Sequence, residues 1–389
     1  MIPYGKHYID QEDINAVIKV LKSDNLTQGP LIASFEKEIS KYVGAKYSVA
    51  VTSCTAGLHL ASIVSKMNKG KVLLTSPITF ASTANSSLFC GGETIFADID
   101  ESTINISIDN IKNVILKNKI HAIAPVHFGG LPCNMKKIKE IGDKVGAIIY
   151  EDAAHAFGAV YTDGSRVGSC KYSDMAVFSF HPVKSIATGE GGVITTNDKK
   201  IYDKLIRLRN HGLEKKKENF ILKKNAFTND LNNPWYYEMQ ELGYNYRITD
   251  IQCALGLSQL KKIDKFIKRR KDLAKKYDLA FENLQNCKPI QKNMRDPSSN
   301  HLYILKIDFQ KLGKTRANLM NEFKRAEIIT QVHYIPVIAH PYFQKKNYKK
   351  DNFPNTFDYY NSALSIPLFY DLTDKQQLYV IAQVKRLIG

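Results

Sequence analysis

The chain has 389 residues, 44% of them apolar, and its 55 basic and 38 acidic side chains leave a formal net charge of +17. An apolar share of this size argues against disorder, and the length predicts two or more packed units. No stretch approaches the roughly 20 apolar residues that a membrane-spanning helix needs. The first ten residues also lack the apolar core of a signal peptide. We therefore expect a soluble, cytoplasmic protein without a membrane partner.

The positive charge raises nucleic-acid binding as an alternative, but it comes from 45 lysines and only 10 arginines. Arginine is the residue that reads bases and phosphates through paired hydrogen bonds, so a dispersed lysine excess is a weak sign of such binding. We expect no nucleic-acid partner and interpret the lysine blocks as solvated surface that would attract an anionic ligand.

The six cysteines are spread along the chain, and no two of them stand at two-residue spacing. Free thiols in a reducing compartment are the simplest interpretation of this pattern. We expect neither a disulfide framework nor a metal site.

From about residue 45 to residue 197, short β-rich runs alternate with stretches of helical length such as 56–67, 82–89 and 108–116. The alternation predicts a mostly parallel sheet covered by helices on both faces, with ligands at the carboxyl ends of the strands. Seven runs are predicted as buried strands: 47–51, 72–75, 94–97, 122–126, 147–150, 175–180 and 192–196.

The second half of the chain has a different composition and different predicted elements. Residues 213–239 are polar and lysine-rich and predict a long loop or insertion. Residues 249–278 predict one or two long helices, and strands such as 301–307 then mix with helices in a smaller α+β domain. We expect a large domain over residues 1–257, N-terminal segment included, and a small domain over residues 258–389.

Two chemically distinctive side chains follow predicted strands. Lys184 comes after the strand that ends near Phe180, and the acidic pair Glu151 and Asp152 follows another strand. A pyridoxal phosphate enzyme needs such a pair: the amine bonds to the cofactor, and a carboxylate keeps the pyridine nitrogen protonated. Of the two acids Asp152 is the better candidate, because Glu151 alternates to the opposite face of an extended segment.

Other residues near strand ends could contact the same ligand. The small residues at 52–57, including Cys54, Thr55 and Ala56, could bring helix amides to an anion, or they could form an ordinary helix cap. Cys54 is not expected to be a nucleophile. Phe80 and His155 could cover a planar ring, although each could equally be a packed core aromatic or a satisfied histidine.

One further residue and two further segments are candidates for the site, each with a plain structural alternative. Ser179 could donate to a phosphate, and residues 189–192 are interpreted as the turn that returns the chain to a strand. The polar run 243–250 opens a helix with Thr249 or Asp250 as its cap, and capping alone would explain that run.

Taken together, these motifs resemble the sugar aminotransferases of the DegT/DnrJ/EryC1/StrS family. The resemblance covers nearly the whole chain and rests on six segments: 26–29, 52–57, 151–158, 178–192, 243–252 and 331–334. It implies the type I aminotransferase fold, an α/β architecture with a large, mostly parallel seven-stranded sheet domain and a smaller C-terminal α+β domain.

The resemblance also implies roles for single residues. Lys184 would bond to pyridoxal 5'-phosphate and Asp152 would pair with its ring nitrogen, while Thr55, Ala56 and Ser179 would hold the phosphate. Asn245 would reach the site of a neighbouring subunit, which implies a homodimer with a shared active site. Family dehydratases carry histidine in place of the lysine, so Lys184 argues for transamination.

Within the family, the likeness is greatest to members that act in pseudaminic acid synthesis. It implies transfer of an amino group from L-glutamate to C4 of a UDP-4-keto-6-deoxy-N-acetylhexosamine. The lysine-rich segment between residues 212 and 243 is longer than usual for that group. The residues expected to contact this substrate are Tyr4, Asp24, Asn25, Leu26, Thr27, Gln331, Val332, His333 and Tyr334.

Two alternatives remain open at this point. One is a transaminase for another keto-sugar nucleotide, of the lipid A or legionaminic acid type. The other is a basic nucleic-acid-binding or regulatory protein on an inactive transaminase fold. A nicotinamide dehydrogenase is disfavoured, because residues 53–55 offer no glycine fingerprint after the first strand.

Overall fold

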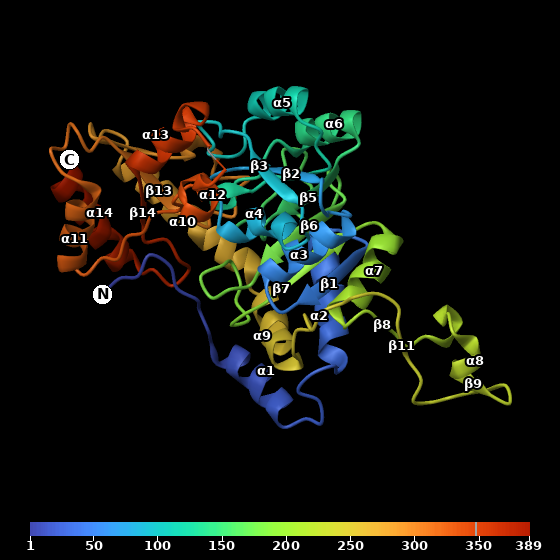
Figure 1. The fold of residues 1–389 in the computed structure, drawn as a ribbon. Coiled ribbons are helices and arrows are strands. Elements are labelled where there is room, and N and C mark those ends of the chain that lie inside the picture. Colours follow the sequence, from blue (N-terminus) through green and yellow to red (C-terminus); the bar gives the residue numbers. More distant parts are fainter. Residues whose placement is uncertain (347) are drawn as a thin grey trace.

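A seven-stranded sheet forms the centre of the larger unit in the computed structural model, which describes residues 1–346 and 348–389 (Figure 1). The strand order is β1-β7-β6-β5-β4-β2-β3, and only β7 runs antiparallel to its neighbours. The predicted mostly parallel sheet is therefore confirmed. Its strands are β1 (Tyr47–Val51), β2 (Val72–Thr75), β3 (Glu93–Phe96), β4 (Ala122–Ala124), β5 (Ile148–Asp152), β6 (Met175–Ser179) and β7 (Gly192–Thr196).

The antiparallel direction of β7 follows from the short connection between β6 and β7. Parallel neighbours need a crossover, usually a helix, whereas the segment from Ser179 to Gly192 contains none. This segment leaves the carboxyl end of β6 and returns beside it, with Gly189 in a left-handed turn at φ 84°. Lys184 lies in the connection, so the topology holds the lysine at the carboxyl edge of the sheet.

Alternation along the strands creates two buried cores, one on each face of the sheet. Val49 and Val51 pack in the core that contains α3 and α7, whereas Ala50 packs in the core of α2, α6 and α9. In β5, Ile149 and Tyr150 divide in the same way. Both faces are apolar, as expected for a sheet covered on two sides.

Eight helices belong to this unit, and α1 packs against α9 at its edge (Figure 1). No helix within the described residues is both long and apolar enough to cross a membrane. The helices are α1 (Gln11–Leu21), α2 (Pro30–Val43), α3 (Cys54–Val64), α4 (Ala81–Leu88), α5 (Ile108–Lys117), α6 (Met135–Val145), α7 (Lys199–Arg209) and α9 (Asp250–Leu260).

Several predicted boundaries shift for local reasons. The strand predicted to reach residue 126 ends at Ala124, because Pro125 has no N–H to continue the ladder. The helix predicted from residue 56 begins at Cys54, because Ser53 caps it. The strand predicted to end at Tyr150 extends to Asp152, so the acid is the last strand residue.

Among the described residues, the C-terminal unit packs five helices and a three-stranded antiparallel sheet, in the order β12-β13-β14. The two long helices predicted from residue 249 are α9 and α10. The elements are α10 (Ile263–Ala280), β12 (Cys287–Pro289), β13 (Tyr303–Ile307), α11 (Arg316–Arg325), α12 (Pro341–Gln344), α13 (Pro354–Ser362), β14 (Ala363–Ile366) and α14 (Asp374–Ile388).

The domain boundary at residues 257 and 258 remains a prediction. Helix α9 continues to Leu260, and the packing partner changes within α10: Phe266 lies in the large core and Leu273 in the C-terminal core. The N-terminal segment, expected in the large domain, has Ile2 packed in the C-terminal core and bridged to Ile328.

The lysine-rich segment projects from the body of the large unit (Figure 1). We call residues 213–242 the arm. It carries apolar side chains that are largely exposed, among them Trp235 and Leu231 at 73% each and Ile221 at 71%. Its short elements are β8 (Leu213–Glu214), α8 (Lys223–Ala226), β9 (Phe227–Thr228), β10 (Leu231–Asn232) and β11 (Glu238–Met239).

Candidate active site

A cavity of about 690 Å³ opens at the carboxyl edge of the sheet, where it meets the C-terminal unit. Its volume lies within the range of small-molecule sites, about 300–1,000 Å³. The large unit contributes Asp152, Ser179 and Lys184 to its wall, and the C-terminal unit contributes His301 and Tyr334. The cavity therefore lies where the predicted fold places ligands.

The amine of Lys184 holds its proton less tightly than an ordinary lysine does. Burial is the main cause that lowers its pKa, to about 8, and Arg270 acts in the same direction, whereas Cys54 and Asp152 oppose the change. An appreciable fraction is thus uncharged near neutral pH, as a nucleophile requires. The Lys184 backbone N–H donates to His181 O at 2.9 Å, which fixes the turn that carries it.

Asp152 is held by two donors at the end of β5. One carboxylate oxygen accepts the Thr83 hydroxyl at 2.5 Å, and the other accepts the Ala154 N–H at 3.1 Å. The side chain is only 4% exposed and lines the cavity. These bonds fix the direction of the carboxylate.

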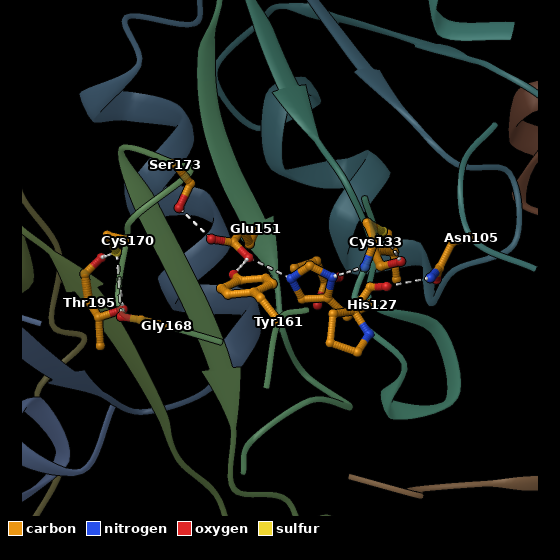
Figure 2. Close-up of polar contacts among 12 residues, drawn as sticks. Asn105, His127, Cys133, Glu151, Tyr161, Gly168, Cys170, Ser173 and Thr195 are labelled. Atoms are coloured by element: carbon orange, nitrogen blue, oxygen red, sulfur yellow. Dashed lines mark hydrogen bonds and ion pairs between the residues drawn. The ribbon is translucent and has the colours of Figure 1, made fainter. Parts of the chain in front are cut away.

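Glu151 points to the opposite face and ends in a closed network (Figure 2). Its carboxylate accepts His127 Nε2–H at 2.6 Å and the hydroxyls of Tyr161 and Ser173. The Cys133 N–H donates to His127 Nδ1 at 3.0 Å, so the ring proton lies on Nε2. Glu151 is thus a satisfied buried acid away from the cavity.

The start of α3 forms one wall of the cavity. Ser53 Oγ accepts the Ala56 N–H at 3.1 Å, so the capping interpretation applies to these two residues. Cys54 and Thr55 line the cavity, whereas Ala56 is buried behind them. A Cβ on Gly192 would lie 2.7 Å from Cys54 N, so glycine lets β7 approach this helix start.

Two further predicted cofactor contacts, Cys54 and Ser179, line the cavity near this wall. Burial raises the pKa of the Cys54 thiol well above its ordinary value, which keeps the thiol protonated and unreactive. Ser179 lines the cavity at the end of β6, and its Oγ accepts the His181 N–H at 3.4 Å.

Aromatic side chains cover the cavity. His155 Nδ1 accepts the Gly129 N–H at 3.3 Å, so its Nε2–H donates to the Tyr334 hydroxyl at 2.9 Å. Burial lowers the pKa of His155 well below its ordinary value, which keeps the ring neutral. Phe80 stands at the rim, 62% exposed, with its ring centroid 6.2 Å from that of Tyr334.

Five of the residues expected to contact the substrate line the cavity: Tyr4, Gln331, Val332, His333 and Tyr334. His333 Nδ1 lies 2.8 Å from Ser365 Oγ, and burial lowers its pKa to about 3. The ring is therefore uncharged at neutral pH and acts as a hydrogen-bonding group rather than a cation.

The other expected contacts lie outside this cavity. Asp24, Asn25, Leu26, Thr27 and Asn245 are all exposed. They gather near the start of α9, because Thr27 bridges Thr249 and the Leu26 carbonyl accepts the Asp250 N–H at 3.0 Å. Within one chain, then, the structure does not bring these five residues to Lys184.

Sequence reasoning missed two residues that touch the central pair. Thr83 bonds Asp152, and His301 Nε2 lies 3.5 Å from Lys184 Nζ. A threonine inside a helix and a histidine before a strand have no distinguishing pattern. Only the tertiary contacts reveal them.

Comparison with known proteins decides the family. Residues 7–385 match the DegT/DnrJ/EryC1/StrS aminotransferase family. The chain belongs to this family. It is a sugar aminotransferase, as the resemblance in the sequence implied.

Relatives match over nearly their whole length. The spore coat polysaccharide biosynthesis protein SpsC of Bacillus subtilis is 39% identical over 100% of this chain and 97% of its own. A Campylobacter jejuni protein named UDP-4-amino-4,6-dideoxy-N-acetyl-beta-L-altrosamine transaminase is 36% identical over 98% of this chain and 96% of its own.

Solved structures agree with the predicted fold class. Helicobacter pylori PseC, described as an aminotransferase of pseudaminic acid biosynthesis, matches with a TM-score of 0.91 at 28% identity, covering 100% of this chain and 99% of its own. The PLP-form of the putative sugar aminotransferase Spr1654 from Streptococcus pneumoniae has a TM-score of 0.87 at 25% identity, over 99% and 98% of the chains.

Proposed function

We propose that this sugar aminotransferase uses pyridoxal phosphate to move an amino group from L-glutamate to C4 of a UDP-4-keto-6-deoxy-N-acetylhexosamine. The product would be UDP-4-amino-4,6-dideoxy-N-acetyl-β-L-altrosamine, in pseudaminic acid biosynthesis. The observation that carries the proposal is that Lys184 and Asp152 line one cavity. The names of the Campylobacter and Helicobacter relatives support the choice of sugar.

The side chains of the cavity fit pyridoxal phosphate. Lys184 supplies an amine with a pKa of about 8, and Asp152 supplies a fixed carboxylate. Ser179 and the first turn of α3 offer donors for a phosphate, and His155 offers a ring face. The bound cofactor would act as an electron sink for the donor α-carbon.

Three side chains of the cavity would then transfer or hold protons. The Lys184 amine would take a proton from the α-carbon of the amino donor and return it on the other side of the transfer. Asp152, oriented by Thr83, would hold a proton on the ring nitrogen of the cofactor. The Tyr334 hydroxyl accepts from His155, so its own proton is free to donate to the substrate.

We further propose a homodimer in which each active site uses residues of both subunits. Asn245 and residues 24–27 are exposed outside their own cavity, which favours a role in the site of a second copy. The exposed apolar side chains of the arm, such as Trp235, favour burial against another chain.

Subunit mixing tests the shared site. Lys184→Ala and Asn245→Ala proteins should each be inactive, but mixing them creates hybrids in which one site has both residues. Random exchange in a twofold dimer should restore about 25% of wild-type activity. Proven exchange without recovery would show that Asn245 acts within its own chain or has no role.

The choice of sugar is tested by comparing 4-keto epimers. We expect kcat/KM for the L-arabino compound to exceed that for the D-xylo compound by about 10²-fold or more, because hydrogen-bonding sites reject misplaced hydroxyls strongly. Tyr334→Phe should reduce this ratio, whereas Tyr342→Phe, whose ring is 59% exposed, should not.

The same substrate panel includes keto-sugar nucleotides of the legionaminic acid and lipid A type. These compounds are included because SpsC, which is 39% identical to this chain, has a name that specifies no sugar. Preference for one of these compounds would replace the proposed sugar and leave the aminotransferase assignment intact.

A further inference from the structure

His301 is a side chain of the C-terminal unit that reaches the Lys184 amine. Its Nε2 lies 3.5 Å from Lys184 Nζ, and the residue is 5% exposed. Its backbone is held on both sides: its N–H donates to Gly129 O at 2.9 Å, and its carbonyl accepts Arg270 Nη1 at 3.4 Å. These contacts from two other elements fix the backbone that carries the imidazole beside the amine.

The ring nitrogens of His301 are not equivalent. Nδ1 is buried and has no hydrogen-bond partner among the residues that the structure describes. A buried N–H without an acceptor is the more expensive state, because that donor loses its only bond. The favoured tautomer therefore carries its proton on Nε2, where Lys184 Nζ is the neighbouring acceptor.

An amine can accept a hydrogen bond only in its uncharged form. Two charged groups near Lys184 act in opposite directions: the carboxylate of Asp152 favours the charged amine, and the Arg270 guanidinium opposes it. The Cys54 thiol stays protonated and adds no charge. His155 and His333 also face the amine, and burial keeps both rings neutral. An N–H donor from His301 thus adds to the groups that favour the neutral amine.

We propose that His301 is a further catalytic residue of this enzyme, donating its Nε2–H to the uncharged ε-amine of Lys184 and keeping that amine neutral and oriented. The long contact lets the amine leave His301 when it takes a proton from carbon. No proton needs to transfer to the ring, which stays neutral throughout. This role rests on the proposed chemistry at Lys184.

The test measures the amine itself in the full-length protein stripped of cofactor with hydroxylamine. Labelling of Lys184 by acetic anhydride, followed by peptide mass spectrometry across a pH series, reports the uncharged fraction. In the wild type we expect the rate to rise through a midpoint near pH 8. In His301→Phe the midpoint should move upward, making labelling at pH 7 about three- to tenfold slower.

The control is His340→Phe, which changes another histidine of the cavity wall and should leave the midpoint in place. A midpoint that stays or falls in His301→Phe would overturn the proposal. An independent measurement uses the wild-type protein and does not depend on a variant that folds. ¹⁵N NMR of histidine-labelled protein stripped of cofactor should show the proton of His301 on Nε2. A proton on Nδ1 would overturn the proposal. Because neither measurement uses sugar or cofactor, failure here leaves the aminotransferase proposal standing.

Discussion

Replacing Lys184 with alanine should abolish turnover. The variant loses the only amine that this cavity wall presents among the described residues, and no other side chain there can both bond to the cofactor and carry the proton between carbons. Loss of a covalent nucleophile costs on the order of 10⁶-fold in kcat. The measurement is the steady-state rate with L-glutamate and the UDP-4-keto sugar.

Lys184→Arg is the matched variant, because it keeps a positive charge but offers no nucleophilic amine. It should be as inactive as Lys184→Ala. Borohydride reduction of the wild-type holoenzyme should fix the cofactor to the peptide that contains Lys184, and neither variant should retain it. Residual turnover, or covalent label on a different lysine, would remove Lys184 from its proposed role. Yellow wild-type protein would also argue against an inactive scaffold.

The second large effect is expected for Asp152→Asn. The amide keeps the shape of the carboxylate and can still accept the Thr83 hydroxyl, but it has no negative charge to hold a proton on the ring nitrogen. A positioned acid–base group contributes about 10²–10⁴-fold to rate, so we expect kcat to fall by that factor while cofactor still binds. Cofactor absorbance and single-turnover rates separate these two outcomes.

Glu151→Gln provides the control, one residue earlier on the same strand. It disturbs the buried network with His127 and Tyr161 but leaves the Asp152 carboxylate in place. We expect a lower melting temperature and a much smaller change in kcat than in Asp152→Asn. Near-normal turnover in Asp152→Asn would mean that another group holds the ring proton.

Much of the fold was predictable from local patterns. The seven strands and the helices between them were predicted because buried strands appear in the sequence as short runs of β-forming residues. Helices instead show a hydrophobic periodicity of their own. The ends were less predictable, since they depend on single residues such as Pro125 and Ser53. The arm contains short elements that its polar composition did not reveal.

From the residues alone one could predict an amine and a carboxylate at strand ends, in motifs that resemble those of the family. This was possible because strand alternation and topology bring the carboxyl ends of neighbouring strands to one edge. Which side chains meet at this edge depends on long-range packing that no local pattern encodes. Thr83 on Asp152 and His301 on Lys184 are contacts between residues 69 and 117 positions apart, and the burial that lowers the pKa of Lys184 likewise depends on the folded structure around it.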